Sequence, residues 1–354
     1  METLAETILV LAAQAGERTA FDTLTNPYRR ELLVHCYRML GSVHDAEDLV
    51  QETLIRAWEK RATFTSPGSY RAWLYRIATN LCLNALARSP KRSLPPSTHP
   101  ATDPTGPLPP RLEEPIWLEP FPDELLADQL ADPENRALQH ERITLAFLVA
   151  LQHLTPAQRA ILLLREVLDW EAREVAEWLH LSVPAVNSAL QRARRTLRQL
   201  HVFPEATNTL SAPQLQTLLD RYVALWEQSD IPGLVALLRD DAWFTMPPMP
   251  AWYQGRTAIA TLFQNTIFTL PRQWHLHPTY ANASPAFGLY RWQGEQDVYQ
   301  LFGLLVLNVV GEQIASTVVF LDLSCLSCFT LPPTFPSDTS VRHAHLCGKV
   351  QSAH

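Results

Sequence analysis

The sequence predicts a multidomain protein in which two all-α helical domains precede a domain of mixed helices and strands. The chain has 354 residues, more than one hydrophobic core usually serves. Twelve prolines fall between residues 90 and 133, which excludes a helix or a central strand there and predicts a linker. After residue 213 short helices are followed by alternating strands, an order typical of an α+β domain.

These boundaries and the charge pattern divide the chain in the same way. The linker carries eight acids and one arginine, whereas residues 182–201 carry four arginines and no acid, so the net charge of −7 hides a basic segment. We therefore expect parts with different partners. They are a helical domain at 1–92, a proline-rich acidic linker at 93–133, a second helical domain at 134–203, an α+β domain at 213–330 and a disordered tail at 331–354.

Three helices are expected in the first domain. A helical period runs from Arg18 to Leu40 and stops at Gly41. The second helix, Asp45–Lys60, has acids in its first turn, which suits the positive end of the helix dipole. The third, Ser69–Arg88, follows a break at Pro67-Gly68. The second helix has one apolar face, made of Ala46, Leu49, Val50, Thr53, Leu54, Ala57 and Trp58.

The second helical domain ends in a predicted helix-turn-helix. Helices are expected at 134–153, 156–166, 171–180 and 183–200. Ser182 suits the N-cap of the last helix, and Pro184 suits its first turn. The polar face of that helix suits DNA, because Asn and Gln can pair with adenine while arginines meet phosphates; the alternative is the solvated face of an ordinary bundle helix. This face comprises Asn187, Ser188, Gln191, Arg194, Arg195 and Arg198.

The α+β domain is expected to form an antiparallel sheet behind three helices. The helices are predicted at 214–229, 231–239 and 255–268. The strands are predicted at 242–246, 273–280, 287–292, 298–310 and 313–323, with a hairpin turn at Gly311-Glu312 before the last one.

Composition excludes several classes of protein. No apolar run reaches the ~18 residues of a membrane span, and the N-terminus lacks the features of a signal peptide, so a cytoplasmic protein is expected. Five dispersed cysteines are no disulfide framework. Cys325-x-x-Cys328, followed by His343, His345 and Cys347, leaves open a zinc or redox site or unrelated thiols; we predict no metal and no cofactor.

Two segments resemble the extracytoplasmic-function (ECF) type of sigma-70 family sigma factors. The string HDAEDLVQETLIRAWEKRATF…SYRAWLYRIATNLCLNALAR is similar to the family's region 2, and LTPAQRAILLLREVLDWEAREVAEWLHLSVPAVNSALQRARRTLRQL is similar to region 4. With the linker they span roughly residues 15–200. The resemblance implies a promoter-directing subunit whose partners are core RNA polymerase and promoter DNA.

The resemblance also implies roles for particular residues. Asp48, Gln51, Glu52 and Arg56 would contact the polymerase's largest subunit. The −10 promoter element would be read by Arg71, Trp73, Arg76, Asn80, Asn84 and Arg88, and the −35 element by region 4, including Ser182. Region 4 departs from the family, because Pro184–Ala189 replaces a run that contains two cations. Phosphate affinity should therefore be lower, and the promoter sequence cannot be carried over.

The C-terminal domain resembles SnoaL-like domains of the NTF2-like fold, through DDAWFTMPPMPAWYQGRTAI at 240–259. In that α+β fold a curved sheet wrapped by helices forms a conical pocket. The resemblance therefore implies a pocket that takes a small-molecule ligand. It also implies that the domain is regulatory and not catalytic. The expected lining is Trp243, Met246, Trp252, Tyr253 and Trp292. In the linker, the apolar stretch Trp117–Asp123 is either a docking point for this domain or a chance cluster.

Two other classes of protein compete with the sigma factor. An effector-responsive helix-turn-helix regulator is the main alternative, but it has no need for a polymerase-docking helix such as Asp45–Trp58. An enzyme fused to a DNA-binding module would need a buried, pKa-shifted group, for which His275, His277 and Asp297 are the candidates.

Overall fold

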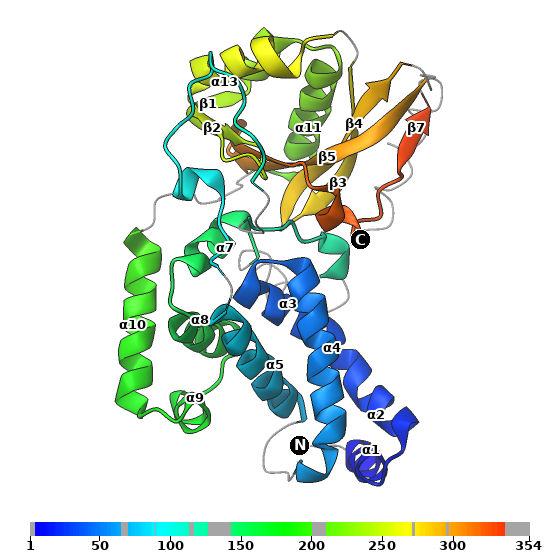
Figure 1. Ribbon diagram of the computed structural model, residues 1–354, viewed down its shortest axis with the longest axis vertical. Helices are drawn as coiled ribbons and strands as arrows, with labels where there is room; N and C mark the ends of the chain where they lie inside the picture. The colour runs from blue at the N-terminus through cyan, green and yellow to red at the C-terminus, as the bar shows by residue number, and fades with distance from the viewer. Residues whose placement is uncertain are drawn as a thin grey trace. The chain divides into compact units, whose positions relative to one another are not determined.

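The computed structural model describes residues 4–64, 70–88, 90–112, 117–126, 143–199, 210–270, 273–294 and 297–336. The chain divides into two compact units (Figure 1). The helical unit comprises residues 1–93 and 124–201, and the sheet unit comprises residues 94–123 and 202–354. The units therefore alternate along the chain, because part of the predicted linker belongs with the C-terminal domain.

The first half of the helical unit is a bundle in which α3, α4 and α5 pack against one another. Helix α4 begins after Ser42, whose hydroxyl accepts a hydrogen bond from the Asp45 amide at 3.1 Å. Gly41 ends α3 with a φ of 74°, in the left-handed region that favours glycine. The helices are α1 (Leu4–Gln14), α2 (Arg18–Thr25), α3 (Arg29–Leu40), α4 (Val43–Glu59) and α5 (Tyr70–Leu86).

The predicted helix Arg18–Leu40 is two helices. A 3₁₀ turn, Asn26–Tyr28, separates α2 from α3. Pro27 lies inside this turn, and proline has no amide hydrogen to donate to the helical ladder. The hydrophobic period continues across the break, which is why the pattern alone predicted one helix.

The second half of the helical unit contains the helix-turn-helix. Its helices are α7 (Leu145–Gln152), α8 (Pro156–Leu162), α9 (Ala172–Leu179) and α10 (Val183–Gln199), and a π-helical turn, Leu163–Val167, follows α8. His180 ends α9 with a φ of 54°, and α10 then packs against α8 and α9 (Figure 1). Residues 134–142 of the predicted helix 134–153 lie outside the described residues, and α7 is the helix found in the rest.

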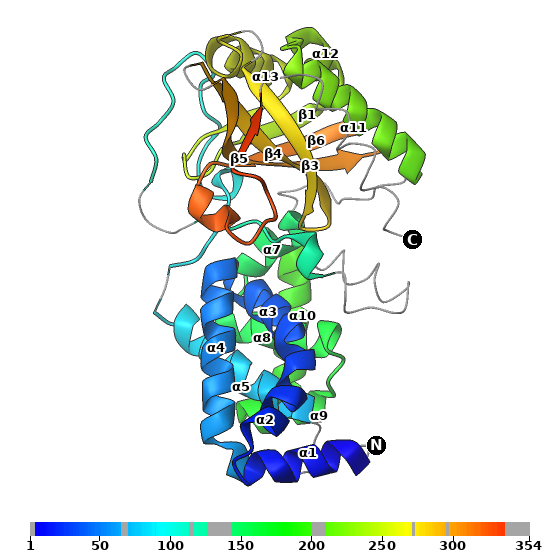
Figure 2. The same cartoon turned by 90° about the vertical axis from the view of Figure 1, so that its right-hand side faces the viewer.

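The sheet unit holds one mixed sheet with helices beside it (Figure 2). Its helices are α11 (Ala212–Glu227), α12 (Ile231–Ala236) and α13 (Arg256–Leu262). The strand order is β2-β1-β6-β5-β4-β3, β1 and β6 are parallel, and β7 pairs with β5. The strands are β1 (Leu238–Thr245), β2 (Trp252–Gln254), β3 (Trp274–Ala281), β4 (Ser284–Gln293), β5 (Val298–Val310), β6 (Gln313–Phe320) and β7 (Thr334–Pro336).

The core of this unit joins the helices to one face of the sheet. Tyr222 and Trp226 from α11 and Phe263 from the turn after α13 pack with Phe244 of β1 and Phe287 of β4. The Tyr222 and Phe287 rings stack at 6.0 Å. Aromatic side chains therefore fill the space between α11 and the sheet.

Three features of the sheet unit differ from the sequence prediction. Helix α12 ends at Ala236, and β1 already begins at Leu238, inside the predicted helix 231–239. The short strands β2 and β7 were not predicted. Strand β7 lies in a tail that was predicted to be disordered from residue 331; residues 337–354 lie outside the described part. Neither short strand is long enough to show an alternating pattern.

Acid should destabilise the helical unit through His35. The ring is buried, its Nε2 lies 2.7 Å from the Thr79 hydroxyl, and burial lowers its pKa from 6.5 to about 3. The contribution of the neutral ring to the free energy of unfolding is therefore fully present above pH 6.5. It is lost as the pH falls towards 3. At pH 5 the loss is about 2 kcal/mol.

Thermal unfolding monitored by near-UV circular dichroism tests this expectation. The parent chain should lose more thermal stability between pH 7.5 and pH 5 than a His35→Gln variant, whose side chain still reaches Thr79 but does not titrate. Equal losses in both proteins would show that another group causes the acid sensitivity.

Candidate functional surfaces

Helix α4 presents a polar row on the side opposite its buried stripe. Asp48 and Gln51 are exposed, and Glu52 and Arg56 are half-buried and joined by an ion pair of 2.6 Å. Ile55 lies within this row with 54% of its surface exposed. All four predicted polymerase contacts thus share one face. Ile55 was not among the predicted contacts, although an apolar residue outside the apolar period is a visible signal for a partner surface.

A second row of exposed polar side chains lies along helix α5, at intervals of four residues. Arg76, Asn80, Asn84 and Arg88 are all exposed, with Arg88 just beyond the end of the helix. Side chains four residues apart lie on one helix face, so two amides and two guanidinium groups face solvent together. This row can meet both base edges and phosphates.

Two other predicted DNA contacts on α5 have structural partners. The Nε of Arg71 lies 2.6 Å from Glu31, and its guanidinium lies over the Tyr75 ring. Trp73 is half-buried and packs on Phe64 and Tyr70 at 5.4 Å each. Glu31 was not predicted as a partner of Arg71, because a partner 40 residues away leaves no local pattern.

The exposed face of α10 holds the predicted region 4 residues. Val186, Leu190 and Ala193 are buried, which turns the opposite polar side outward. Ser182 is already used as an N-cap, since its hydroxyl accepts from the Ala185 amide at 3.3 Å. Arg194 is paired with Glu166 at 2.5 Å. The exposed set is Ser182, Asn187, Ser188, Gln191, Arg194, Arg195 and Arg198.

Residues 94–112 and 117–123, here called the docked segment, belong to the sheet unit and contact its strands and loops. At one edge of the sheet, the Trp252 indole donates to the His99 carbonyl at 2.8 Å, and the Thr102 amide donates to the Trp252 carbonyl at 2.8 Å. Further along, the Trp117 indole donates to the Pro248 carbonyl at 3.1 Å. The segment therefore makes direct hydrogen bonds with β2 and with the loop after β1.

The docked segment ends at the β3–β4 hairpin. The Asn282 side chain accepts from the Phe121 amide at 3.0 Å, and the Asn282 amide donates to the Phe121 carbonyl at 2.9 Å. The Ala283 amide donates to Asp123 at 2.9 Å, and burial raises the pKa of this carboxyl to about 7. Of the two readings of Trp117–Asp123, the structure supports docking on the C-terminal domain.

The five predicted pocket residues lie in different surroundings. Met246 and Tyr253 belong to the hydrophobic core, Trp243 is buried and Trp292 is exposed. Trp252 holds the docked segment. That they line one pocket stays a prediction; side chains along a strand alternate between faces, and aromatic side chains pack beside α11.

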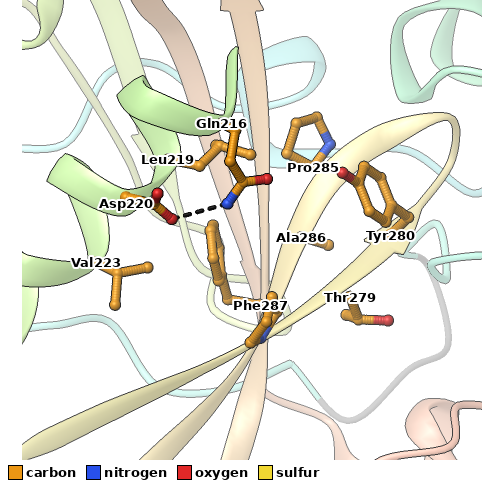
Figure 3. A pocket seen from close by; sticks show the side chains of 10 residues that line it. Gln216, Leu219, Asp220, Val223, Thr279, Tyr280, Pro285, Ala286 and Phe287 are labelled. Carbon is orange, nitrogen blue, oxygen red and sulfur yellow. Dashed lines mark hydrogen bonds between the residues drawn. The ribbon is translucent and has the colours of Figure 1, made fainter. Parts of the chain in front are cut away.

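Figure 3 shows a depression at another place on the sheet unit, between α11 and the β3–β4 hairpin. Its empty volume is about 340 Å³, open solvent included, and the Gln216 amide donates to Asp220 at 2.8 Å on one wall. It is lined by Gln216, Leu219, Asp220, Val223, Pro278, Thr279, Tyr280, Pro285, Ala286 and Phe287.

The surroundings of His275, Cys325 and Cys328 bear on the candidate catalytic and metal-binding roles. His275 Nδ1 lies 2.6 Å from Glu227, and aromatic rings including Tyr290 and Phe335 surround the imidazole. Cys325 and Cys328 are free thiols, and burial raises the pKa of Cys325. Over the described ranges no three His, Cys, Asp or Glu side chains gather as a metal site would need. His343, His345 and Cys347 lie outside those ranges.

Comparisons with known proteins assign all three folded parts. Family models match residues 24–92 as sigma-70 region 2, residues 144–197 as sigma-70 region 4 and residues 219–317 as a SnoaL-like domain. The ECF RNA polymerase sigma factor SigG of Mycobacterium tuberculosis is 46% identical over 92% of this chain and 89% of its own length. SigW of Bacillus subtilis, also an ECF sigma factor, is 28% identical over 52% of this chain and 90% of its own length.

A solved structure shares the fold. The crystal structure of the extracytoplasmic function sigma factor SigJ of Mycobacterium tuberculosis matches with a TM-score of 0.57 at 21% identity, and the match covers 84% of this chain and 95% of that one. Region 2, region 4 and the fold together define a promoter-recognition subunit of bacterial RNA polymerase. The chain belongs to the ECF sigma factors of the sigma-70 family.

Membership settles the class of function. The chain is a non-enzymatic initiation factor that binds core RNA polymerase and promoter DNA and directs the polymerase to promoters. The effector-responsive regulator is not favoured. Among the described helices, none combines the length and apolar character that crossing a bilayer requires.

The ion pair between Glu166 and Arg194 should weaken DNA binding by region 4. A Glu166→Gln variant frees one guanidinium for phosphate, so the salt dependence of binding to a −35 duplex should steepen by up to ~0.9 in the slope of log K against log salt. Fluorescence anisotropy between 50 and 200 mM salt measures this slope.

Glu177→Gln is the matched control, since Glu177 pairs with Arg173 on α9 at 3.1 Å. It removes the same charge and should leave the slope closer to that of the parent. If both variants change the slope equally, net charge rather than the Glu166–Arg194 pair governs binding.

Proposed function

We propose that this sigma factor binds core polymerase through α4, reads the −10 element with α5 and the −35 element with α10, and is restrained by its SnoaL-like domain. The exposed polar row on each helix supports the contacts with polymerase and DNA. The proposed polymerase contacts are Asp48, Gln51, Glu52, Arg56 and also Ile55. Because polymerase and promoters lie in the bacterial cytoplasm, that is the compartment we propose.

Restraint is supported by one observation, the hydrogen bonds that hold the docked segment on the sheet unit. This segment joins region 2 to region 4, and it is acidic, as expected for a chain that lies in the basic nucleic-acid channels of the polymerase. The same residues cannot lie there while Trp117 and Phe121 are bound to the sheet unit. Undocking is therefore the step that the SnoaL-like domain controls.

The depression between α11 and the β3–β4 hairpin is our candidate site for a small-molecule ligand. It lies on the hairpin that binds Phe121 and Asp123, so an occupant there would act on the end of the docked segment. Tyr280 lines the depression, and burial together with the Asp123 charge raises its pKa. The depression and the docking contacts are thus joined through one hairpin.

Weakening the docking should raise transcription. A Trp117→Phe, Asn282→Gly double variant removes two hydrogen bonds, and glycine keeps the left-handed backbone of Asn282 at φ 54°. Losing about 2 kcal/mol would favour the undocked segment ~30-fold. Run-off transcription with core polymerase, on promoters selected by genome-wide binding, measures the effect.

Two comparisons complete this experiment. Trp292→Phe changes an exposed tryptophan in the same unit and should behave as the parent. A chain that ends near Val202 should be at least as active as the double variant. If neither the full chain nor the truncated chain binds core polymerase, the roles proposed here are wrong; if the truncated chain is less active, the SnoaL-like domain assists rather than restrains.

Docking should also weaken as pH rises. Because burial raises the pKa of Asp123 from 3.8 to about 7, docking favours the protonated acid. Docking is strongest below pH 3.8, where Asp123 is protonated whether or not the segment is docked. Above pH 7 docking carries the full free-energy cost of burying the ionised carboxylate. An Asp123→Asn variant should therefore strengthen docking more at pH 8 than at pH 5.

Hydrogen exchange of the Asn282 and Ala283 amides, corrected for intrinsic rates, reports docking at each pH. Asp103→Asn is the control, since Asp103 lies in the same segment and its carboxylate accepts hydrogen bonds from Thr105, two residues away. A protective effect of Asp123→Asn that is the same at both pH values would contradict the titration of this carboxyl.

A further inference from the structure

Two cysteines share one turn after β6. Residues Leu323–Leu326 form a 3₁₀ turn, and Ser327, just after it, keeps right-handed helical backbone angles. Cys325 and Cys328 are three residues apart on this stretch. Because side chains three residues apart eclipse each other in a 3₁₀ helix, the two thiols lie on the same side of the turn.

The spacing of the pair fits a disulfide. At a rise of ~2.0 Å per residue, the Cα atoms of Cys325 and Cys328 lie about 6 Å apart, and disulfides join Cα atoms that are ~4.4–6.8 Å apart. The Cys325 thiol donates to the Asp322 carbonyl at 2.9 Å, and the Cys328 thiol donates back to the Cys325 carbonyl at 3.6 Å. The Cys328 sulfur therefore already lies toward Cys325.

The two thiols differ in exposure. Cys325 has 4% of its surface exposed, whereas Cys328 is half-buried. Burial, together with the charges of Glu119 and Asp322, raises the pKa of Cys325. Since oxidants attack the thiolate of an accessible cysteine, Cys328 is the first thiol to react. Cys325 follows by reacting with the oxidised Cys328.

The docked segment is anchored to the same loop as this turn. In the loop after β1, the carbonyls of Pro247-Pro248 accept from the Leu321 amide at 2.9 Å and from the Trp117 indole at 3.1 Å. Leu321 leads into the turn that carries Cys325, and Trp117 lies two residues before Glu119. The Glu119 charge accordingly acts on Cys325.

We propose that Cys325 and Cys328 form a redox site, which a peroxide oxidises to a disulfide and which the docked segment protects. Hydrogen peroxide converts the Cys328 thiol to a sulfenic acid, and one water leaves. The Cys325 sulfur then attacks the sulfenic sulfur, the S–S bond forms, and the hydroxyl leaves with the Cys325 proton as a second water. The two sulfurs together lose two electrons, which the peroxide gains. A small dithiol reverses the reaction by thiol–disulfide exchange.

Protection by the docked segment follows from the position of Glu119. While the segment is docked, this charge adds to the effect of burial on the pKa of Cys325 and disfavours the thiolate that attacks Cys328. Release of the segment removes the charge, so the disulfide forms faster in released molecules. This protection rests on the docking proposed above, whereas the oxidation of the pair does not.

Peroxide treatment of the full chain tests the redox site. In a Cys347→Ser background, the reduced chain is treated with hydrogen peroxide, the remaining thiols are alkylated in denaturant, and the peptide with Cys325 and Cys328 is weighed by mass spectrometry. This peptide should lose two hydrogen atoms and regain them with dithiothreitol. Cys36 and Cys82 are completely buried and should stay reduced. Alkylation of both Cys325 and Cys328, or a sulfinic acid on Cys328 without a disulfide, would overturn the proposal.

Two serine variants test the order of the steps. Cys325→Ser should stop at a sulfenic acid on Cys328, which dimedone traps, and its hydroxyl can still donate to the Asp322 carbonyl. Cys328→Ser leaves only the buried thiol and should react severalfold more slowly than the parent. If Cys328→Ser is oxidised as fast as the parent, Cys325 is attacked first and the proposed order is wrong.

The rate of disulfide formation tests the protection. Glu119→Gln removes the charge, and the Trp117→Phe, Asn282→Gly double variant weakens docking. Both proteins should form the disulfide severalfold faster than the parent. Asp103→Asn removes a charge elsewhere in the docked segment and should match the parent. Parental rates in Glu119→Gln and in the double variant would show that the docked segment does not protect the pair.

These measurements separate the redox site from the proposed docking. If hydrogen exchange of the Asn282 and Ala283 amides shows no docking in the parent, the restraint and the protection both fail, and the mass of the peptide still decides whether the pair is a redox site. If Cys325→Ser does not fold, the mass of the parental peptide decides as well, because it needs no variant of the pair.

Discussion

The burial of one stripe on each helix is the constraint on which the binding surfaces depend. Helix α4 buries Ala46, Val50 and Leu54, and α10 buries Val186, Leu190 and Ala193. Because an α-helix repeats every ~3.6 residues, fixing one stripe also fixes which residues face away from the core. The polymerase and DNA rows are therefore positioned by hydrophobic packing, and ion pairs with Glu52 and Glu166 additionally hold Arg56 and Arg194.

Much of the helical unit could be predicted from sequence for this reason. The starts of α4 and α10 follow from local chemistry, namely the caps at Ser42 and Ser182 and the apolar period behind them. The break at Pro27 shows the limit of periodicity, because the apolar pattern continues through the 3₁₀ turn. The partners Glu31 and Glu166 were missed because they lie 40 and 28 residues from the arginines that they neutralise.

The sheet unit was harder to predict because its decisive contacts are long-range. The pairing of Phe121 with Asn282 spans 161 residues, and that of Trp252 with His99 spans 153. The predicted pocket residues came from the resemblance of the domain to a conical fold; strand geometry sends Tyr253 into the core and leaves Trp292 exposed. Composition identified a domain with many aromatic residues but not which of them form its core.

The contacts of Thr102 with Trp252 have a consequence for solubility. Strand β2 lies at one end of the sheet order, and Thr102 occupies both the amide and the carbonyl of Trp252. An edge strand with unpaired backbone groups is a template for pairing with another chain. The docked segment thus shields the sheet margin, and a molecule that has released it carries an open edge on which a second copy can add a strand. The undocked state is therefore more prone to self-association than the docked state.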